Sequence, residues 1–213
     1  MKKTLILLFA IVLFPLACKD RQDLQPANSK SNLTYSDLPK YEHKWIEYKT
    51  LEGIKTNLTE LYISDFGDTL VFQNIVYENE KIDSTRSDFL DFTASWVNDT
   101  TISGRVSVYS RNDHIIKSPL LERKINLQFI QFMNGKKGTV EFNAINKNFV
   151  DFEFQNENDS LIGILVDYSQ YDTIVNEIES IRIIETKYPL DNKPSTNNIF
   201  IQVQDLHNQQ NKR

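Results

Sequence analysis

From residue 41 onward, the chain alternates short runs rich in valine, isoleucine, phenylalanine, tyrosine and threonine with clusters of asparagine, aspartate, glycine and serine. The runs recur about every ten residues, and apolar and polar positions alternate with a period of two in many of them. Successive side chains of a strand point to opposite faces of a sheet, so this pattern predicts an all-β domain. About eleven strands are expected, over residues 44–50, 59–63, 69–77, 88–96, 104–109, 125–133, 139–145, 149–155, 160–168, 178–186 and 198–204.

Two turns and one strand define the arrangement further. Asn134-Gly135 predicts a tight hairpin turn, because this dipeptide readily adopts positive φ angles. Asn146-Lys147-Asn148 predicts a second hairpin between two runs of period two. Residues 161–166 are apolar on both faces and predict a central strand covered on both sides. So many strands in one domain favour an antiparallel β-sandwich, with a closed β-barrel as the alternative.

The remaining segments are weaker in pattern. Residues 19–40 are polar and unpatterned, which predicts a flexible tether. Residues 187–198 are typical of a loop, and residues 205–213 of a frayed, disordered tail. Spacings of three and four allow short helical turns near residues 118–124 and 171–179.

Composition excludes several classes of function. The chain has 24 basic and 29 acidic residues, a net charge of -5, which gives no electrostatic basis for binding nucleic acid. One cysteine and three histidines cannot supply a thiolate zinc site or a disulfide framework, and no cofactor is expected. We expect His43, His114 and His207 to be solvated, and Asp65-Phe66-Gly67 to be a turn.

The first eighteen residues carry an export pattern. A basic start is followed by an apolar run over residues 5–16, which is too short to span a bilayer, and then by Ala17 and Cys18. The sequence Phe14-Pro15-Leu16-Ala17-Cys18 resembles the lipobox of bacterial lipoproteins. The resemblance implies cleavage before Cys18, a diacylglycerol thioether on its sulfur and a further acyl chain, such as palmitate, on the new amine. Ordinary signal cleavage, which leaves a free thiol, is the alternative.

The residues after the cysteine suggest a location. Lys19-Asp20 resembles part of the surface-export signal of certain Gram-negative outer-membrane lipoproteins. The resemblance implies a lipid-anchored protein in the outer membrane, on the cell surface or the periplasmic face, with the bilayer as a partner. The expected organisation is a signal peptide over residues 1–17, the lipidated cysteine and tether over 18–40, the β-sandwich over 41–204 and the tail over 205–213.

Five tripeptides begin with aspartate, continue with serine or threonine and end with an aliphatic residue or threonine, more often than the composition predicts. They resemble the acceptor of the periplasmic O-glycosylation system of some of these bacteria. The alternative is local, since aspartate often caps a turn that leads into a strand. The hydroxyls that the resemblance assigns as acceptors belong to Thr69, Ser84, Thr100, Ser160 and Thr173.

Carboxylates and aromatic residues offer two further candidate sites. If the hairpin at Lys147 pairs, Glu141 lies opposite Glu153 with Asp151 on the diagonal. Such a cluster suits a calcium ion or the acid and nucleophile of a retaining glycosidase, and the alternative is a solvated face eased by nearby lysines. The aromatic residues that are candidates for a sugar-stacking platform, most of them expected in the core, are Trp45, Trp96, Tyr168 and Tyr171.

These observations favour a non-enzymatic lipoprotein whose β-sandwich binds an envelope protein or a glycan. A polysaccharide hydrolase that uses paired carboxylates is the first alternative. A structural accessory subunit of a surface assembly is the second. An enzyme needs a pocket that converges on titratable groups, whereas a binding module can use a flat face or a sheet edge.

Overall fold

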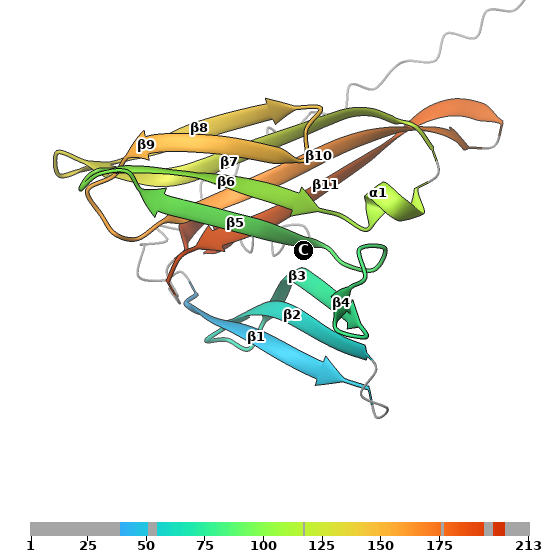
Figure 1. Cartoon of the computed structure of the whole chain (residues 1–213), viewed down its shortest axis with the longest axis horizontal. Helices are drawn as coiled ribbons and strands as arrows, with labels where there is room; N and C mark the ends of the chain where they lie inside the picture. Colours follow the sequence, from blue (N-terminus) through green and yellow to red (C-terminus); the bar gives the residue numbers. More distant parts are fainter. Residues whose placement is uncertain (1–38, 51–54, 117, 176, 194–197, 203–213) are drawn as a thin grey trace, which may run out of the picture. The chain divides into compact units, whose positions relative to one another are not determined.

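The computed structural model describes residues 39–50, 55–116, 118–175, 177–193 and 198–202 (Figure 1). Within these ranges the chain forms eleven strands in three antiparallel sheets, and the predicted all-β fold is confirmed. One sheet has the order β1 (Tyr41–Lys49), β2 (Lys55–Ser64), β3 (Thr69–Glu78), β4 (Lys81–Ile82). A second has the order β11 (Ile178–Asp191), β10 (Ile162–Val175), β7 (Leu120–Met133), β8 (Lys136–Ile145). The third has the order β5 (Phe89–Trp96), β6 (Thr101–Tyr109), β9 (Phe149–Gln155), and helix α1 covers Asn112–Ile115.

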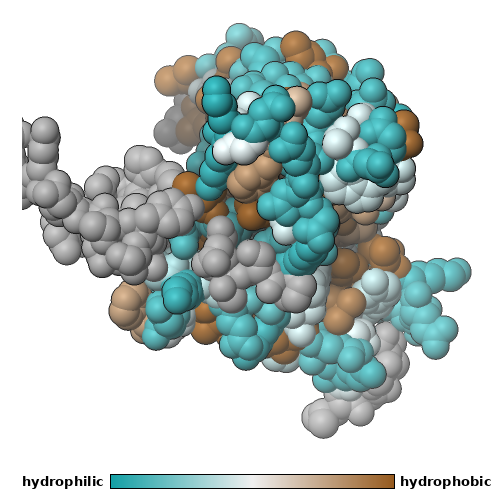
Figure 2. All heavy atoms as spheres, turned by 90° about the vertical axis from the view of Figure 1, so that its left-hand side faces the viewer, coloured by the Kyte–Doolittle hydropathy of each residue, from teal (hydrophilic) through white to brown (hydrophobic). Residues whose placement is uncertain are grey.

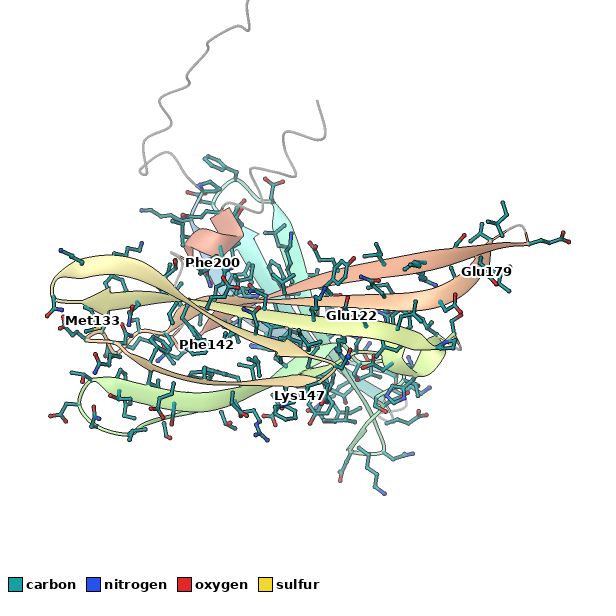
Figure 3. All side chains as sticks on the ribbon, turned by 90° about the horizontal axis from the view of Figure 1, so that it is seen from above. Glu122, Met133, Phe142, Lys147, Glu179 and Phe200 are labelled. Atoms are coloured by element: carbon teal, nitrogen blue, oxygen red, sulfur yellow. The ribbon has the colours of Figure 1, made fainter. Side chains whose placement is uncertain are left out.

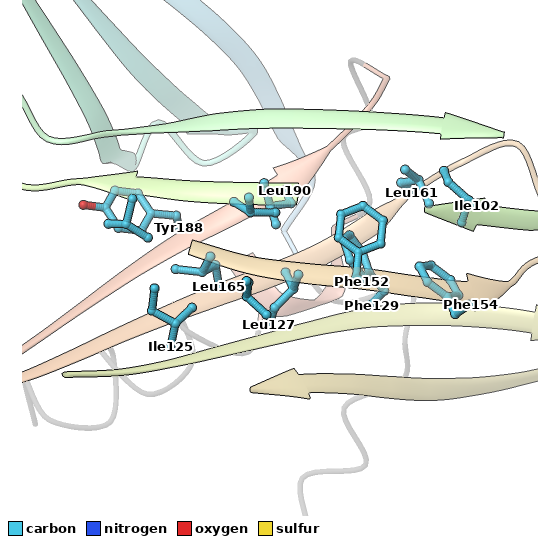
Figure 4. Packing of buried hydrophobic residues seen from close by; sticks show 13 residues of the cluster. Ile102, Ile125, Leu127, Phe129, Phe152, Phe154, Leu161, Leu165, Tyr188 and Leu190 are labelled. Atoms are coloured by element: carbon cyan, nitrogen blue, oxygen red, sulfur yellow. The ribbon is translucent and has the colours of Figure 1, made fainter. Parts of the chain in front are cut away.

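The main core lies between the β11-β10-β7-β8 sheet and the β5-β6-β9 sheet, which form a sandwich with open edges (Figure 4). Phe129 of β7 packs against Phe152 and Phe154 of β9, with ring centroids 4.9 and 5.2 Å apart. Each such ring contributes about 1.5–3 kcal/mol when it leaves water. Strand β10 is central in its sheet, as its two apolar faces predicted. On the face shown in Figure 2, hydrophilic side chains dominate and hydrophobic ones form separate patches.

The Asn134-Gly135 turn is confirmed. Met133 of β7 pairs with Lys136 of β8, which leaves the two residues as a tight loop with φ angles of 51° and 69°. Positive φ at both positions matches the right-handed twist of the two strands that the loop joins. Figure 3 places Met133 of β7 and Glu179 of β11 at opposite ends of the β11-β10-β7-β8 sheet.

The second predicted hairpin is wrong. Strand β8 pairs with β7, and strand β9 pairs with β6 in the other layer, so Asn146-Lys147-Asn148 carries the chain from one sheet to the facing one. The apolar residues of both strands then face one core from opposite sides, and the rings of Phe142 and Phe152 have centroids 6.1 Å apart. A paired hairpin would place all of these side chains in one layer and bury less apolar area.

The β1-β2-β3-β4 sheet joins the sandwich through β3. Asn74 forms an isolated bridge with Asp88, and the side-chain oxygen of Gln73 accepts a hydrogen bond from the backbone N–H of Leu90. A small second core gathers Tyr41, Tyr62 and Ile201.

The segment that carries Ile201 corrects another prediction. Residues 199–202 are helical, whereas a strand was expected over 198–204. The side chain of Asn198 accepts a hydrogen bond from the backbone N–H of Phe200 and donates to the backbone oxygens of Gly163 and Leu190. This local side-chain bonding favours a helical turn over an extended segment.

Three other predictions fail at the ends of long strands. The helical turns that the spacing allowed near residues 118–124 and 171–179 do not form, because β7 begins at Leu120 and β10 continues to Val175. The loop expected from residue 187 begins only after Asp191, because Tyr188 and Leu190 are buried in the main core. Pro189 is tolerated there because β11 lies at the edge of its sheet.

Candidate functional site

The outer face of the β5-β6-β9 sheet combines aromatic, hydroxyl and charged side chains. Alternate residues of these strands, such as Val106 and Phe152, point into the core, so their neighbours point outward. Below, this outward surface is called the polar face. Its residues, in rows across the sheet, are Phe89 and Tyr109; Asp91, Ser107 and Phe149; Thr93, Arg105 and Asp151; and Ser95, Ser103 and Glu153.

One end of the polar face is aromatic. The rings of Phe89 and Tyr109 are stacked, with centroids 4.7 Å apart and planes 8° from parallel. Phe89 is 8% exposed, whereas Tyr109 is 40% exposed, so the buried ring supports one that faces water. The pair borders an aromatic hollow of about 520 Å³, to which β3 contributes Ile75 and Tyr77. Asp91 and Ser84 line the same hollow and supply hydrogen-bonding oxygens.

The middle of the polar face is built around an ion pair. Arg105 donates from Nε to Asp151 Oδ1 at 2.6 Å and from Nη2 to Oδ2 at 3.0 Å. Its guanidinium also lies over the ring of Phe149, 4.2 Å from the centroid. The hydrogen bond from Arg105 is the main cause that lowers the pKa of Asp151, with a smaller contribution from Lys147. Asp151 is therefore ionised at neutral pH and accepts hydrogen bonds only.

A shallow hollow of about 610 Å³ surrounds this ion pair. Thr93 and Ser103 supply hydroxyls to its lining, and Glu153 supplies a second carboxylate. At the aromatic end, the exposed ring of Tyr109 lies on the same face as these hydrogen-bond donors and acceptors. This combination suits a ligand with apolar patches and many hydroxyls, which is the chemistry of a sugar. The polar face can therefore stack a sugar at its aromatic end and bind its hydroxyls in the middle.

The candidate aromatic platform does not form. Trp45 and Trp96 are 44% and 42% exposed, so the prediction that most of these aromatics are buried is wrong for both tryptophans. Tyr171 is buried and Tyr168 half-buried. Among the described residues, the ring contacts pair none of the four with another. The stacked pair that does form is Phe89 with Tyr109. The two residues meet because of the register of β5 with β6, which no local sequence pattern indicated.

The predicted opposition of Glu141 to Glu153 is wrong, because the two residues belong to different sheets. Glu141 accepts hydrogen bonds from the side-chain amides of Asn126 and Asn143, and Glu153 lies opposite Ser103. Across the residues that the structure describes, no group of three or more His, Cys, Asp or Glu side chains is placed to hold a metal ion. The calcium site proposed for Glu141, Asp151 and Glu153 therefore has no geometric support there.

The five predicted acceptor hydroxyls differ in exposure. Thr69, Ser84 and Thr100 belong to exposed residues at a strand start or in turns. Ser160 and Thr173 belong to half-buried residues. The structure thus places three of these hydroxyls where a transferase can reach them, and modification itself stays a prediction.

The histidines do not behave alike. His43 is half-buried, stacks on Tyr62 and binds Oε1 of the buried Glu60 at 2.9 Å, so the expectation of a solvated side chain is wrong for it. His114 is exposed in α1, and His207 lies outside the described residues. The turn expected at Asp65-Phe66-Gly67 is confirmed, with Gly67 at φ 91°.

The predicted signal peptide, Cys18 and nearly all of the tether lie outside the described residues. In the part of the chain that is described, no helix has the length and apolar character needed to cross a membrane.

The polar face is the part of the described molecule whose chemistry best suits a ligand. Comparison of the chain with protein-family models, with curated proteins and with solved structures gave no match.

Proposed function

We propose that this chain is an outer-membrane lipoprotein, anchored through acyl chains on Cys18, whose β-sandwich is a non-enzymatic module that binds a glycan on the polar face. The lipobox-like leader supports the anchor. The tether then holds the sandwich away from the bilayer, where large envelope or extracellular glycans are accessible.

The exposed ring of Tyr109, backed by Phe89, is the observation that carries the glycan proposal. The apolar surface of an exposed tyrosine ring is unfavourable in water, and a ligand that covers the ring removes this surface from water. The ring is held flat by its stacked neighbour, so little conformational entropy is lost when a sugar packs on it. The neighbouring carboxylates and hydroxyls, among them Asp91 and Thr93, supply the polar part of the contact.

The alternative of a glycoside hydrolase has less support on this face. A hydrolase of this kind needs a carboxylic acid whose pKa is raised, so that it can protonate the leaving group. Asp151 has a lowered pKa and is bound on both oxygens by Arg105. Its hollow is also shallow, whereas catalysis favours a site that excludes water.

Affinity electrophoresis tests the glycan proposal. The full-length protein, solubilised in detergent, is run through native gels that contain xylan, β-glucan, mannan, pectin or chondroitin sulfate. We expect at least one polysaccharide to retard the protein. Tyr109→Ala should abolish that retardation, whereas Tyr48→Ala, which removes a tyrosine of β1 that is even more exposed to water, should retain it.

The same samples separate the alternatives. Release of reducing sugar from the retained polysaccharide would favour the hydrolase. Retardation that Tyr109→Ala and Tyr48→Ala reduce equally, or no retardation by any polysaccharide, would contradict the glycan proposal. In the latter case, crosslinking in intact membranes identifies the envelope protein that is the alternative partner.

The anchor has an independent test. Cys18→Ser removes the thiol that would carry the diacylglycerol, and we expect the protein to leave the detergent phase in phase-partitioning experiments. Full retention of the variant in the detergent phase would contradict lipidation at Cys18.

Glycosylation at the aspartate tripeptides is tested by mass spectrometry of the native protein. Glycan mass is expected on one or more of the exposed hydroxyls of Thr69, Ser84 and Thr100, and alanine at the occupied position should remove it. An intact mass equal to the acylated polypeptide alone would reject the modification.

A further inference from the structure

Three of the five arginines in the described ranges line one hollow of about 530 Å³. They are Arg86, which follows β4, Arg111, which precedes α1, and Arg182 of β11. We call this space the arginine hollow. Its other lining residues are Asn57, Asn74, Val76, Thr85 and Asn112. Such a gathering of guanidinium groups stands out in a chain with a net charge of -5.

The positive charge of the arginine hollow is only partly compensated. Arg111 Nε lies 2.9 Å from Asp88 Oδ2, and Arg86 Nη1 lies 3.9 Å from Asp83 Oδ2. The side chain of Arg182 makes no hydrogen bond or ion pair with any residue that the structure describes. The hollow therefore has three positively charged guanidinium groups and only two nearby carboxylates to balance them.

Both carboxylates are committed to other groups as well. Asp88 Oδ1 accepts hydrogen bonds from the Ser110 hydroxyl and from the backbone N–H of Arg111. Asp83 Oδ1 accepts hydrogen bonds from the backbone N–H and the hydroxyl of Thr85. These contacts hold the carboxylates to the protein and leave guanidinium N–H groups available to a ligand.

The neutral lining also offers donors. The side-chain oxygen of Asn74 already accepts a hydrogen bond from the Thr59 hydroxyl at 3.1 Å, which leaves its amide N–H groups to donate. The side-chain amides of Asn57 and Asn112 make no hydrogen bond with a described residue. A hollow with three guanidinium groups and three amides is rich in donors, and oxyanions are the ligands that such a lining recognises.

We propose that the arginine hollow binds a phosphate or sulfate group. A single carboxylate carries one negative charge and two oxygens, whereas these tetrahedral anions present more acceptor oxygens and, as free dianions, twice the charge. The site goes beyond the glycan contact of the polar face. Asn74 and Val76 of β3 line the arginine hollow, and the alternate residues Ile75 and Tyr77 line the aromatic hollow, so the two hollows use opposite faces of β3.

Calorimetric titration of the full-length, detergent-solubilised protein tests this proposal. Inorganic phosphate, sulfate, glucose 6-phosphate and acetate are titrated at constant ionic strength, set with chloride. Saturable binding is expected for phosphate or sulfate, and acetate should bind about tenfold more weakly. Tighter binding of glucose 6-phosphate than of inorganic phosphate would assign the group to a larger phosphorylated ligand, and the reverse would assign a free anion.

Two variants locate the site. Arg182→Gln removes the uncompensated guanidinium and should weaken binding about tenfold, because a charge-assisted hydrogen bond is lost. Lys187→Gln removes one positive charge from the same strand outside the hollow, where Lys187 pairs with Glu185, and should leave the affinity unchanged. Both positions are surface ones, and a thermal melt confirms that each variant is folded.

The proposal is overturned if neither phosphate nor sulfate gives saturable binding. It is also overturned if the two variants weaken binding equally, since the effect would then be one of net charge. Acetate binding as tight as phosphate would reject the tetrahedral anion in favour of a carboxylate.

Discussion

Arg105–Asp151 and Arg123–Asp167 are the same chemical pair in two surroundings. In each, Nε donates to Oδ1 and Nη2 donates to Oδ2, at 2.6 and 3.0 Å for Arg105 and at 2.9 and 2.7 Å for Arg123. The Arg105 and Asp151 side chains are 52% and 60% exposed, whereas those of Arg123 and Asp167 are 5% and 6% exposed. The two pairs thus share the same two-bond arrangement but differ in exposure to water.

The surroundings decide the roles. Arg123 also donates to Asp113 at 2.9 Å, and the Tyr171 hydroxyl donates to Asp113 as well, so the buried pair belongs to a closed network. Burial by itself would lower the pKa of Arg123, but Asp167 and Asp113 raise it. Water already competes for the groups of the exposed pair, which therefore exchange partners with a ligand at little cost. The buried pair holds the fold, and the exposed pair is available for binding.

The largest expected effect is at the buried pair. Arg123→Gln leaves Asp167 buried without its cation, and we expect the free energy of unfolding to fall by about 3–5 kcal/mol. Denaturant unfolding followed by circular dichroism measures this. The matched variant Arg105→Gln should lower the same quantity by less than about 1 kcal/mol. Equal losses in the two variants would remove the distinction between the pairs.

Alkaline pH should destabilise the native state through two buried tyrosines. Burial raises the pKa of Tyr62 and of Tyr188, and Glu60 and Asp88, respectively, add to the increase. Above about pH 10 the unfolded chain loses these protons while the native state keeps them, so stability is lost as the pH rises. Each tyrosine lowers the free energy of unfolding by up to about 1.4 kcal/mol per pH unit. Denaturant unfolding between pH 9 and pH 12 measures the slope, which Tyr188→Phe should reduce; a slope unchanged by that substitution would contradict the assignment.

Acid pH should act weakly on the exposed pair. Arg105 lowers the pKa of Asp151, so the pair stabilises the native state above the pKa of about 3.9 for an unfolded aspartate. This contribution is lost as the pH falls through the lower native value. Because both side chains are exposed, the difference in unfolding free energy between the wild type and Arg105→Gln should be small at pH 7 and should vanish near pH 2. A difference that persists at pH 2 would show that Arg105 stabilises the fold by packing instead.

Local patterns predicted much of the fold. Runs rich in β-branched and aromatic residues, many of them alternating with period two, located ten of the strands. Asn134-Gly135 identified a turn whose two residues have positive φ. These local patterns did not predict which strands pair with each other or which sheet each strand joins. The hairpin expected at Lys147 was wrong because β8 and β9 bury more apolar area from opposite layers, a preference set by partners distant in sequence.

The candidate sites were harder to predict for the same reason. Phe89 and Tyr109 meet only through the register of β5 with β6. Arg86, Arg111 and Arg182 come together from three separate segments, and no short motif marks any of them. The buried pair likewise joins residues 44 positions apart. Each site depends on non-local contacts, which a single sequence does not reveal.

Glycan binding on the polar face is tested most directly by the affinity of Arg105→Gln for the polysaccharide that retards the wild type most strongly. We expect this variant to bind at least about tenfold more weakly, because Arg105 lies in the middle of the polar face and its guanidinium can donate charge-assisted hydrogen bonds to a sugar. Its free energy of unfolding should stay within about 1 kcal/mol of the wild type. Unchanged affinity in the folded variant would contradict glycan binding on the polar face.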